Sequence, residues 1–363
     1  MRGLEPGTDG NAPEGPVLIT GGAGFIGTNL ANRLLENGEQ VVLFDNLSRA
    51  GVEQNIDWLR ATHGDAVRLI VADVQDARAL RRAVQHSGSI FHFAAQVAVT
   101  TSLEDPLLDF EVNARGTLNL LSAWREMHTP CPLVFTSTNK VYGSLEGLSL
   151  REQAERYEPT DPAVRNRGVG EDRGLHFYSP YGCSKGAADQ YVLDHAQTFG
   201  LPAAVFRMSC IYGPHQCGTE DQGWVAHFLI QAQERQRLMI YGDGKQVRDI
   251  LFVEDLLDAF LLAREQMGKI AGQAFNIGGG PANTTSLLEL LELIETLEGQ
   301  ATQVSFAEWR PGDQKYYVSD TTKFQEVTGW RPKVPAKEGV RRLHRWLRDT
   351  ALARENAAAA LRE

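Results

Sequence analysis

A glycine-rich segment near the start of the chain, Thr20-Gly-Gly-Ala-Gly-Phe-Ile-Gly27, constrains the fold more than any other feature of the sequence. It follows the apolar run Val17–Thr20 and opens a helical stretch for which Gly38 is a suitable end. Its Gly22-x-Gly24-x-x-Gly27 pattern permits a tight turn and a close approach of the backbone to a pyrophosphate. The start of the helix then offers free N–H groups to phosphate. We therefore expect a dinucleotide-binding crevice in a parallel sheet.

Short apolar runs alternate with helical stretches, as in a parallel sheet that is covered on both faces. The runs are Val17–Thr20, Val41–Phe44, Val67–Val71, Ile90–Phe93, Leu133–Thr136 and Ala203–Phe206. Helices are expected from an Asp105-Pro106 start to about Met127, over 181–199 before Gly200, and over Ser286–Leu297. The fold class predicted is α/β, a Rossmann-type doubly wound parallel sheet with a smaller C-terminal substrate-binding α/β domain.

The predicted domain boundaries follow the point near residue 210 where the regular alternation of strands and helices ends. Residues 1–15 are expected to be a flexible tail, 16–208 the NAD-binding domain with a returning segment at about 240–265, and 347–363 a second tail. Residues 209–239 and 266–346 are assigned to the substrate domain. A long charged insert at 144–177 has no clear secondary structure, so a lid and a disordered loop remain open.

Composition excludes several classes of function. A net charge of -10 disfavours nucleic acid as a partner. The four cysteines form no CxxC pair and no zinc-type spacing, so no metal is expected. The N-terminus lacks the apolar core of a signal peptide and no run is long enough to cross a membrane, so we expect a cytoplasmic protein with no membrane partner.

Acidic and small residues follow the predicted strands where a cofactor would lie. Asp45 ends the second run, where a carboxylate can accept hydrogen bonds from both ribose hydroxyls and repels a 2′-phosphate, so NAD is preferred over NADP. Arg49 weakens that preference slightly. Asp73 follows the third run, where both a position near adenine and a helix cap remain open. Ala94-Ala95-Gln96 follows the fourth run.

Two Tyr-x-x-x-Lys pairs occur, and only one suits a helix. Tyr241 and Lys245 enclose two glycines, whereas Tyr181 and Lys185 open the helical run after Ser179-Pro180. In a helix, both side chains of a pair lie on one face, one turn apart. Lowering a tyrosine pKa from about 10 to about 7 takes roughly 4 kcal/mol of preference for the phenolate. The expected sources of that preference are Lys185 and a positively charged nicotinamide ring.

Together these features resemble the extended short-chain dehydrogenase/reductase family over most of the chain, from about Val17 to Trp346. The resemblance implies a catalytic set of Thr138, at the end of the fifth strand, with Tyr181 and Lys185. It also implies a role near the cofactor for the helix residue Asn113. The predicted cofactor-binding residues are Gly21, Gly24, Phe25, Ile26, Gly27, Asp45, Asn46, Ser48, Asp73, Val74, Ala94, Ala95, Gln96, Asn113, Thr136, Tyr181 and Lys185.

Longer strings narrow the resemblance to the CDP-paratose 2-epimerases. They are Thr136–Gly143, Ser179–Gln190, Glu220–Trp224, Gly242–Asp249 and Phe275–Gly280. This implies that a nucleotide-linked hexose is oxidised at carbon 2 by NAD, turned over as a keto sugar, and reduced on its other face. It also implies diphosphate contacts from two arginines and a homodimer or homotetramer built on the helices near 106–127 and 181–199. The implied substrate-binding residues are Thr138, Asn139, Gln222, Gly223, Trp224, Arg248, Arg310 and Asp313.

Three departures and three alternatives qualify that expectation. The chain has His176 where the family usually has aspartate, Gly170 before Glu171 where an aspartate is usual, and Cys210 where asparagine is usual, all expected near the sugar or its linker. A 4-epimerase uses the same Thr, Tyr and Lys set. A 4,6-dehydratase needs an Asp-Glu pair after the threonine and is disfavoured. A non-catalytic NAD-binding regulator is the third alternative.

Overall fold

The chain forms two α/β units around one extended crevice. The structure is a computed structural model that describes residues 15–360, with side chains up to Leu352. The predicted tail at 1–15 lies almost entirely outside the described residues, as do residues 361–363 of the second tail. Among the described helices, none is long and apolar enough to span a lipid bilayer.

The larger unit is built on a seven-stranded parallel sheet with the order β12-β8-β5-β4-β1-β2-β3. Its strands are β1 (Val17–Thr20), β2 (Val41–Asp45), β3 (Val67–Val71), β4 (Ser89–His92), β5 (Leu133–Thr138), β8 (Ala203–Met208) and β12 (Gln273–Ile277). Their side chains are largely buried on both faces, which explains the near-continuous apolar runs in the sequence. This confirms the predicted Rossmann-type fold.

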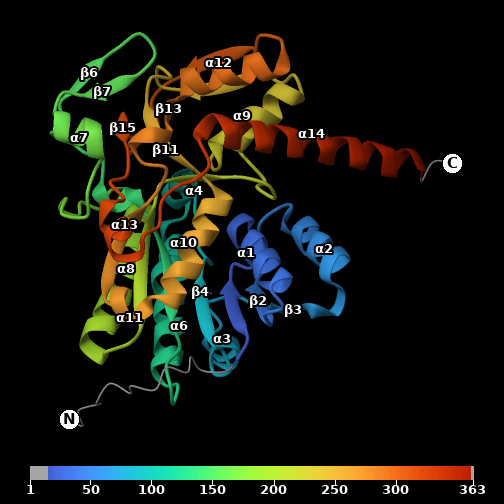
Figure 1. Cartoon of the computed structure of the whole chain (residues 1–363), viewed down its shortest axis with the longest axis vertical. Helices are drawn as coiled ribbons and strands as arrows, with labels where there is room; N and C mark the ends of the chain where they lie inside the picture. Colours follow the sequence, from blue (N-terminus) through green and yellow to red (C-terminus); the bar gives the residue numbers. More distant parts are fainter. Residues whose placement is uncertain (1–14, 361–363) are drawn as a thin grey trace.

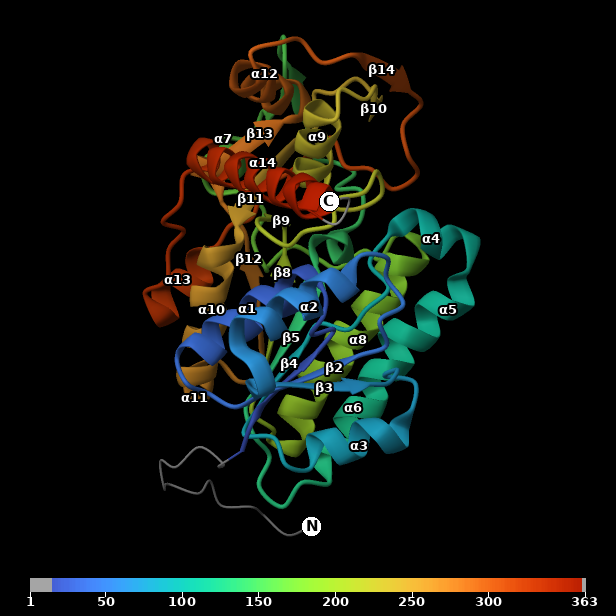
Figure 2. The same ribbon diagram turned by 90° about the vertical axis from the view of Figure 1, so that its right-hand side faces the viewer.

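Helices cover both faces of the sheet. One apolar core packs α1 (Phe25–Glu36), α2 (Val52–His63) and α10 (Val253–Glu265) on one face, and a second packs α3 (Ala77–Val84), α6 (Gly116–Arg125) and α8 (Ser179–Phe199) on the other. In Figure 2, α10 lies to the left of the strands and α3, α6 and α8 lie to their right. The strands thus run between two helical layers, with their carboxyl ends toward the second unit.

The helix expected over 106–127 is interrupted by one wider turn. It consists of α5 (Pro106–Phe110), a π-helical turn at Glu111–Arg115, and α6. The Asp105 side chain caps its start by accepting from Leu108 N at 2.9 Å, as the sequence predicts. A π turn inside a helix is frequent at functional sites. Here it places Asn113 against the loop after β4.

The second unit sits above the strand ends, as Figure 1 shows. Its sheet joins β11 (Val247–Phe252) to β13 (Thr284–Ser286), β15 (Tyr316–Tyr317) and β9 (Cys210–Tyr212), while β10 (Leu238–Tyr241) pairs with β14 (Val304–Ala307). Around them pack α9 (Trp224–Gln233), α12 (Leu287–Glu298) and α14 (Ala336–Ala360). Shorter elements are α4 (Val99–Glu104), α7 (Pro162–Arg167), α11 (Met267–Ile270), α13 (Thr322–Thr328), and the 3₁₀ turns η1 (Gly64–Ala66), η3 (Asn139–Tyr142) and η4 (Pro281–Asn283).

The domain boundaries differ from the predicted ones in two places. The returning segment was placed at about 240–265, yet β10 and β11 pair within the second unit, and of that segment α10 and the Leu251 side chain of β11 pack into the core of the first. The strand that returns to the large sheet is β12, which was assigned to the substrate domain. Its pairing with β8 joins residues far apart in the chain, a contact that local periodicity does not encode.

The insert at 144–177 is ordered and lies against the second unit. It forms a hairpin of β6 (Leu150–Glu152) and β7 (Tyr157–Pro159), followed by α7. Tyr157 N donates to Lys245 O at 3.0 Å, and Arg156 donates to Thr284 Oγ1 at 2.9 Å. These contacts exclude the disordered-loop interpretation and keep the insert on the substrate side of the molecule.

Candidate active site

A cavity of about 710 Å³ runs along the carboxyl ends of the strands. Its wall contains every predicted cofactor residue except Asn113, together with Thr138, Gln222, Gly223 and Trp224 of the predicted substrate residues. The other four predicted substrate residues, Asn139, Arg248, Arg310 and Asp313, lie outside this wall. Crevices at this end of a doubly wound sheet are where ligands bind in such folds.

The glycine loop lies so close to its neighbours that side chains do not fit there. A Cβ on Gly27 would lie 2.4 Å from Gly21 O, and a Cβ on Gly21 would lie 2.7 Å from Ala94 N. The N-cap position of α1 is Gly24, which has no side chain to accept from the first amides of the helix. These amides lie in the cavity wall and have no side-chain cap. This is the arrangement that binds a pyrophosphate at a helix start.

Asp45 connects the glycine loop to the end of β2. Its carboxylate accepts from Ala23 N at 3.0 Å and from Leu47 N at 2.8 Å, and burial raises its pKa against the lowering effect of these two bonds. A carboxylate has about four acceptor positions, so capacity remains for ribose hydroxyls. Asp45 and Arg49 both line the cavity, as the sequence analysis expected.

The structure decides between the two readings of Asp73. Its carboxylate accepts from Asn46 Nδ2 at 2.6 Å and from Gln75 N at 2.8 Å while facing the cavity. The cap of α3 is Asp76, which accepts from Arg78 N and Ala79 N. Asp73 therefore is not the helix cap, and it remains a candidate for the adenosine end of the cofactor.

Asn113 lies behind the cavity wall, and its hydrogen-bonding groups are engaged within the protein. Its Oδ1 accepts from Gln96 N at 2.9 Å, and its Nδ2 lies 3.0 Å from Gln96 O, 3.1 Å from Asp109 Oδ1 and 3.0 Å from Ser184 Oγ. Asn113 thus holds Gln96, which does line the cavity, and does not itself face the cofactor space. Direct cofactor binding by Asn113 is corrected to an indirect role.

The predicted catalytic three meet at one place. Thr138 ends β5, and Tyr181 and Lys185 lie one turn apart near the start of α8. The Thr138 side chain lies near enough to the Tyr181 phenol to lower its pKa, and Lys185 Nζ donates to Thr136 O at 2.7 Å. All three side chains line the cavity. The Tyr241–Lys245 pair, in contrast, lies in a turn where each side chain binds a different glutamate.

The pKa of Tyr181 moves in the direction opposite to the one expected. Burial raises the pKa of Tyr181 to about 12, although the hydrogen bond with Thr138 opposes this. Burial also lowers the pKa of Lys185 to about 8, while Asp189 and Asp109 oppose that shift. Lys185 therefore does not activate the phenol by itself, because its ammonium is directed at a main-chain carbonyl. The remaining expected source of activation is the positive charge of a nicotinamide ring.

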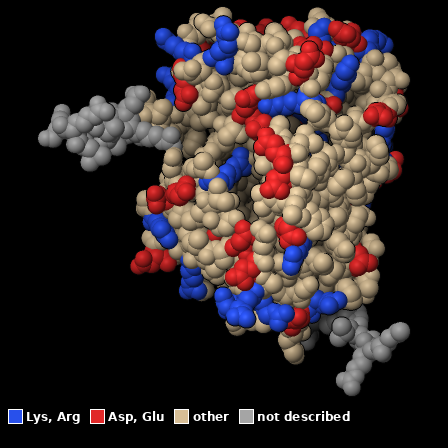
Figure 3. Space-filling view, turned by 180° about the vertical axis from the view of Figure 1, so that it is seen from behind, with Lys and Arg blue, Asp and Glu red and all other residues tan. Residues whose placement is uncertain are grey.

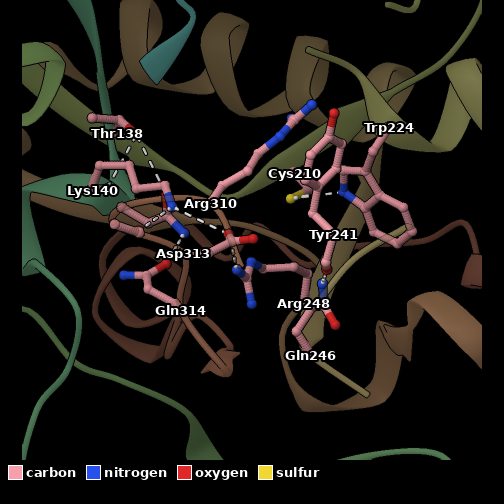
Figure 4. A network of polar contacts seen from close by, with 12 residues as sticks. Thr138, Lys140, Cys210, Trp224, Tyr241, Gln246, Arg248, Arg310, Asp313 and Gln314 are labelled. Carbon is pink, nitrogen blue, oxygen red and sulfur yellow. Dashed lines mark hydrogen bonds and ion pairs between the residues drawn. The ribbon is translucent and has the colours of Figure 1, made fainter. Parts of the chain in front are cut away.

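The predicted diphosphate arginines are paired with acidic residues (Figure 4). Arg248 Nη2 lies 3.3 Å from Asp313 Oδ1. Arg310 contacts Glu220 and Asp221 at 3.3 and 3.4 Å, and stacks 3.8 Å from the centre of the Tyr241 ring. The charges of both arginines are therefore balanced in part by the protein itself. Figure 3 shows, on the face opposite to that of Figure 1, a hollow with a basic side chain in it and acidic side chains beside it.

Asn139 lies between the catalytic strand and the 309–314 loop. Its Oδ1 is 3.4 Å from Thr138 Oγ1, and its Nδ2 is 3.4 Å from Gln314 Oε1.

Of the three family departures, Cys210 lines the cavity and accepts from Trp224 Nε1 at 3.3 Å. Glu171 binds Asn276 N and lines a different cavity, so its expected place near the sugar is wrong. His176 binds Val141 O through its main-chain N–H and does not line the large cavity.

The sequence analysis missed polar residues that line the same cavity. Ser137 is buried with its hydroxyl unpartnered among the described residues, as is the side-chain oxygen of Gln216. A signal for Ser137 existed, because it lies between Thr136 and Thr138 at a strand end, where side chains of both faces can reach the crevice. Gln216 follows no motif, and only the folded loop after β9 places it at the cavity.

Comparisons with known proteins agree with this geometry. Residues 18–343 match the family described as GDP-mannose 4,6 dehydratase. The chain is 43% identical to CDP-paratose 2-epimerase of Salmonella typhi, over 91% of this chain and 98% of that protein. Among solved structures, UDP-glucose 4-epimerase of Thermotoga maritima with UDP-glucose has a TM-score of 0.79 and 30% identity, covering 93% of this chain and 99% of that one. UDP-glucose 4-epimerase of Thermus thermophilus with NAD has a TM-score of 0.76 and 32% identity, covering 92% and 99%.

Proposed function

We propose that the chain, which belongs to the GDP-mannose 4,6 dehydratase family within the extended short-chain dehydrogenases/reductases, is an NAD-dependent epimerase that inverts carbon 2 of a nucleotide-linked hexose. The type of reaction is the conversion of CDP-paratose to CDP-tyvelose. The observation that carries the proposal is the convergence of Thr138, Tyr181 and Lys185 on a cavity that also holds the glycine loop.

The residues present fit NAD. The glycine loop leaves no space for side chains beside the expected pyrophosphate, α1 presents its first amides, and Asp45 retains acceptor capacity for ribose hydroxyls. Bound NAD+ supplies a hydride acceptor that returns the same hydride, so the reaction needs no other oxidant or reductant. The Asp45 carboxylate favours NAD over NADP because it repels a 2′-phosphate.

The chain's own residues then handle the proton of the sugar hydroxyl. With NAD+ bound, Tyr181 would lose its own proton to solvent, and its phenolate oxygen would then take the proton of the sugar hydroxyl and return it when the ketone is reduced. Thr138 lies beside this oxygen in the cavity wall and is placed to hold the sugar hydroxyl there. Lys185, one helical turn from Tyr181, is fixed to Thr136 O. A proton acceptor held in place in this way contributes about 10²- to 10⁴-fold in rate.

Two alternatives differ in specific residues. A 4,6-dehydratase is disfavoured, since Asn139 and Lys140 follow Thr138 where an acid-base pair is needed. A 4-epimerase remains a second candidate, because relatives of the chain bear that name and the catalytic three do not determine which carbon faces the cofactor. The 43% identity to a 2-epimerase favours carbon 2.

Proton NMR on a panel of nucleotide sugars tests the proposal. The purified protein is incubated in deuterated water with CDP-, GDP- and UDP-hexoses, including CDP-paratose. Inversion at carbon 2 without deuterium at that carbon is the expected result, because hydride returns internally. Inversion at carbon 4 would change only the carbon assigned to the reaction and would leave the roles of Thr138, Tyr181 and Lys185 as they are. Deuterium at the inverted carbon would replace hydride return with an enolisation route, and binding of NAD without turnover would favour a regulator.

We also propose a homodimer formed through α5 and α8. Leu107, Phe110 and Tyr191 on these helices are 68, 50 and 45% exposed. Exposed apolar side chains that gather on one face typically mark an association surface. The family resemblance places its dimer contact on the same helices, which supports a second copy of this chain as the occupant.

A further inference from the structure

Lys140 is a partly buried cation that the catalytic scheme does not use. It follows Thr138 by two residues at the start of η3, and its main-chain N–H donates to Thr138 Oγ1 at 3.2 Å. The side chain is 21% exposed, and its Nζ donates to Gly312 O at 3.0 Å. Figure 4 shows it directed from the end of β5 toward Asp313. The residue therefore joins the catalytic strand to the loop that carries Arg310.

The charges around Lys140 do not balance within the protein. Asp313 Oδ1 lies 3.9 Å from Lys140 Nζ and 3.3 Å from Arg248 Nη2, so one carboxylate faces two cations. No other acidic group of the described residues lies within ion-pair distance of either cation. The charges of Lys140 and Arg248 repel each other, and that of Lys140 acts on Cys210, which lines the large cavity. A cluster with excess positive charge beside a ligand cavity is suited to an anion.

The loop at 310–313 is wedged between the two catalytic elements. Gly312 has a φ of +76°, and a Cβ there would lie 2.8 Å from the ring of Tyr178, three residues before Tyr181. On its other side, the Gly312 carbonyl accepts from Lys140. An anion that draws the Lys140 ammonium toward the cavity would thus act on the same loop as Arg310.

We propose that Lys140 is a specificity-determining residue that binds the sugar-proximal phosphate of a nucleoside diphosphate, exchanging its contact with Gly312 for a phosphate oxygen. The same phosphate also neutralises part of the charge of Arg248, which shares Asp313 with Lys140. The inference rests on the proposed function, because it takes a nucleotide-linked sugar as the ligand. It adds a residue that binds the second phosphate and lies two positions after the catalytic Thr138 in the chain.

The test compares nucleoside diphosphates with monophosphates, because the two differ by the phosphate in question. Titration calorimetry on the NAD-loaded protein gives Kd for CDP and CMP, and likewise for UDP and UMP and for GDP and GMP. For the best-bound nucleotide, Lys140→Met is expected to weaken diphosphate binding about tenfold, or about 1.4 kcal/mol. Monophosphate binding should change less than about twofold. Lys140→Arg keeps the charge and should retain most of the preference for the diphosphate.

Lys323→Met is the matched control. Lys323 also donates to a main-chain carbonyl, Ala274 O at 2.9 Å, and burial lowers its pKa too, but it lies on α13 beside the insert. It should leave both affinities unchanged. A thermal melt shows whether each variant is folded.

Three results would overturn the inference. Equal weakening of diphosphate and monophosphate by Lys140→Met means that the amine only fastens the loop. Unchanged binding of both means that it has no part in recognition. If the wild-type protein binds no nucleoside diphosphate, the proposed function fails and this inference fails with it. If the wild type binds the diphosphate and Lys140→Met binds it equally well, only this inference fails.

Discussion

Lys185 donates to the main-chain carbonyl of Thr136 at 2.7 Å, so its ammonium is fixed by the strand that also ends in Thr138. The ammonium also lies 4.4 Å from the centre of the Phe135 ring. These contacts explain how a buried lysine keeps a fixed position in an apolar wall. The phenol of Tyr181 stays neutral until another positive charge is present, because burial raises its pKa to about 12.

Removal of the Tyr181 hydroxyl separates an enzyme from a regulator. Tyr181→Phe is expected to lower kcat by about 10²- to 10⁴-fold, because the group that takes the sugar proton is lost. NAD binding should change little, and this is measured by fluorescence titration alongside a coupled or NMR assay of turnover. Tyr191→Phe, on the same helix but with an exposed side chain, is the control. Full activity of the Tyr181 variant would contradict the proposed role.

The Asp45 carboxylate sets the preference between NAD and NADP. Asp45→Asn keeps the shape of the side chain but replaces one carboxylate oxygen by an amide nitrogen and removes the charge, so the ratio of Kd for NADP+ to Kd for NAD+ should fall about tenfold, or about 1.4 kcal/mol. Affinity for NAD+ should fall as well, because Asp45 also holds Ala23 N and Leu47 N. An unchanged ratio would show that selection against the 2′-phosphate does not come from Asp45; it cannot come from Arg49 in the same cavity wall, because a positive charge attracts phosphate.

The local motifs of the site could be predicted because their spacing determines their geometry. The glycines of the loop, Asp45 at the end of β2 and the Tyr181–Lys185 helix turn all depend on residues near them in sequence. The strand-end rule of parallel sheets then brings them to one crevice. The same reasoning predicted a long helix over 181–199, which the structure begins at Ser179 and ends at Gly200 in the left-handed conformation.

Contacts between distant residues could not be predicted in the same way. Arg248 and Asp313 are 65 positions apart, so the sequence indicated an arginine for the diphosphate and a substrate-binding aspartate but not that they pair with each other. Asn113 carries the right residue type beside the site, yet four internal hydrogen-bond contacts turn it toward Gln96, Asp109 and Ser184. The short strands of the insert depend on partners such as Lys245 and Thr284 and have no periodicity of their own.

The exposed face of α5 and α8 predicts the effect of a charge on association. Phe110→Glu should convert the dimer to a monomer, because an ionised carboxylate is costly to bury in an apolar contact. Sedimentation velocity measures the change. Val71→Glu, at the sheet edge on β3 and 62% exposed, introduces the same charge away from that face and should remain dimeric. A wild-type protein that sediments as a monomer at micromolar concentration would contradict the proposed interface.

Nucleoside diphosphate affinity should depend on pH through Lys140. Burial and the neighbouring charge of Arg248 lower the pKa of Lys140 to about 8, while Asp313 and Cys210 oppose this. Binding of a phosphate beside the ammonium raises that pKa, because it favours the charged form. Diphosphate affinity is therefore complete below about pH 8 and decreases above it, by at most tenfold per pH unit, until the pKa of the complex is reached.

Calorimetry in buffers of different ionisation enthalpy checks this, because proton uptake on binding should appear near pH 8 to 9, where free Lys140 has lost part of its proton. Lys185 titrates in the same window, so the comparison is made within pairs: Lys140→Met should lose the proton uptake that the wild type shows, and a nucleoside monophosphate should show little in either protein. The same pH dependence in the wild type and in Lys140→Met would assign the proton to Lys185, and would remove the electrostatic basis for phosphate recognition by Lys140.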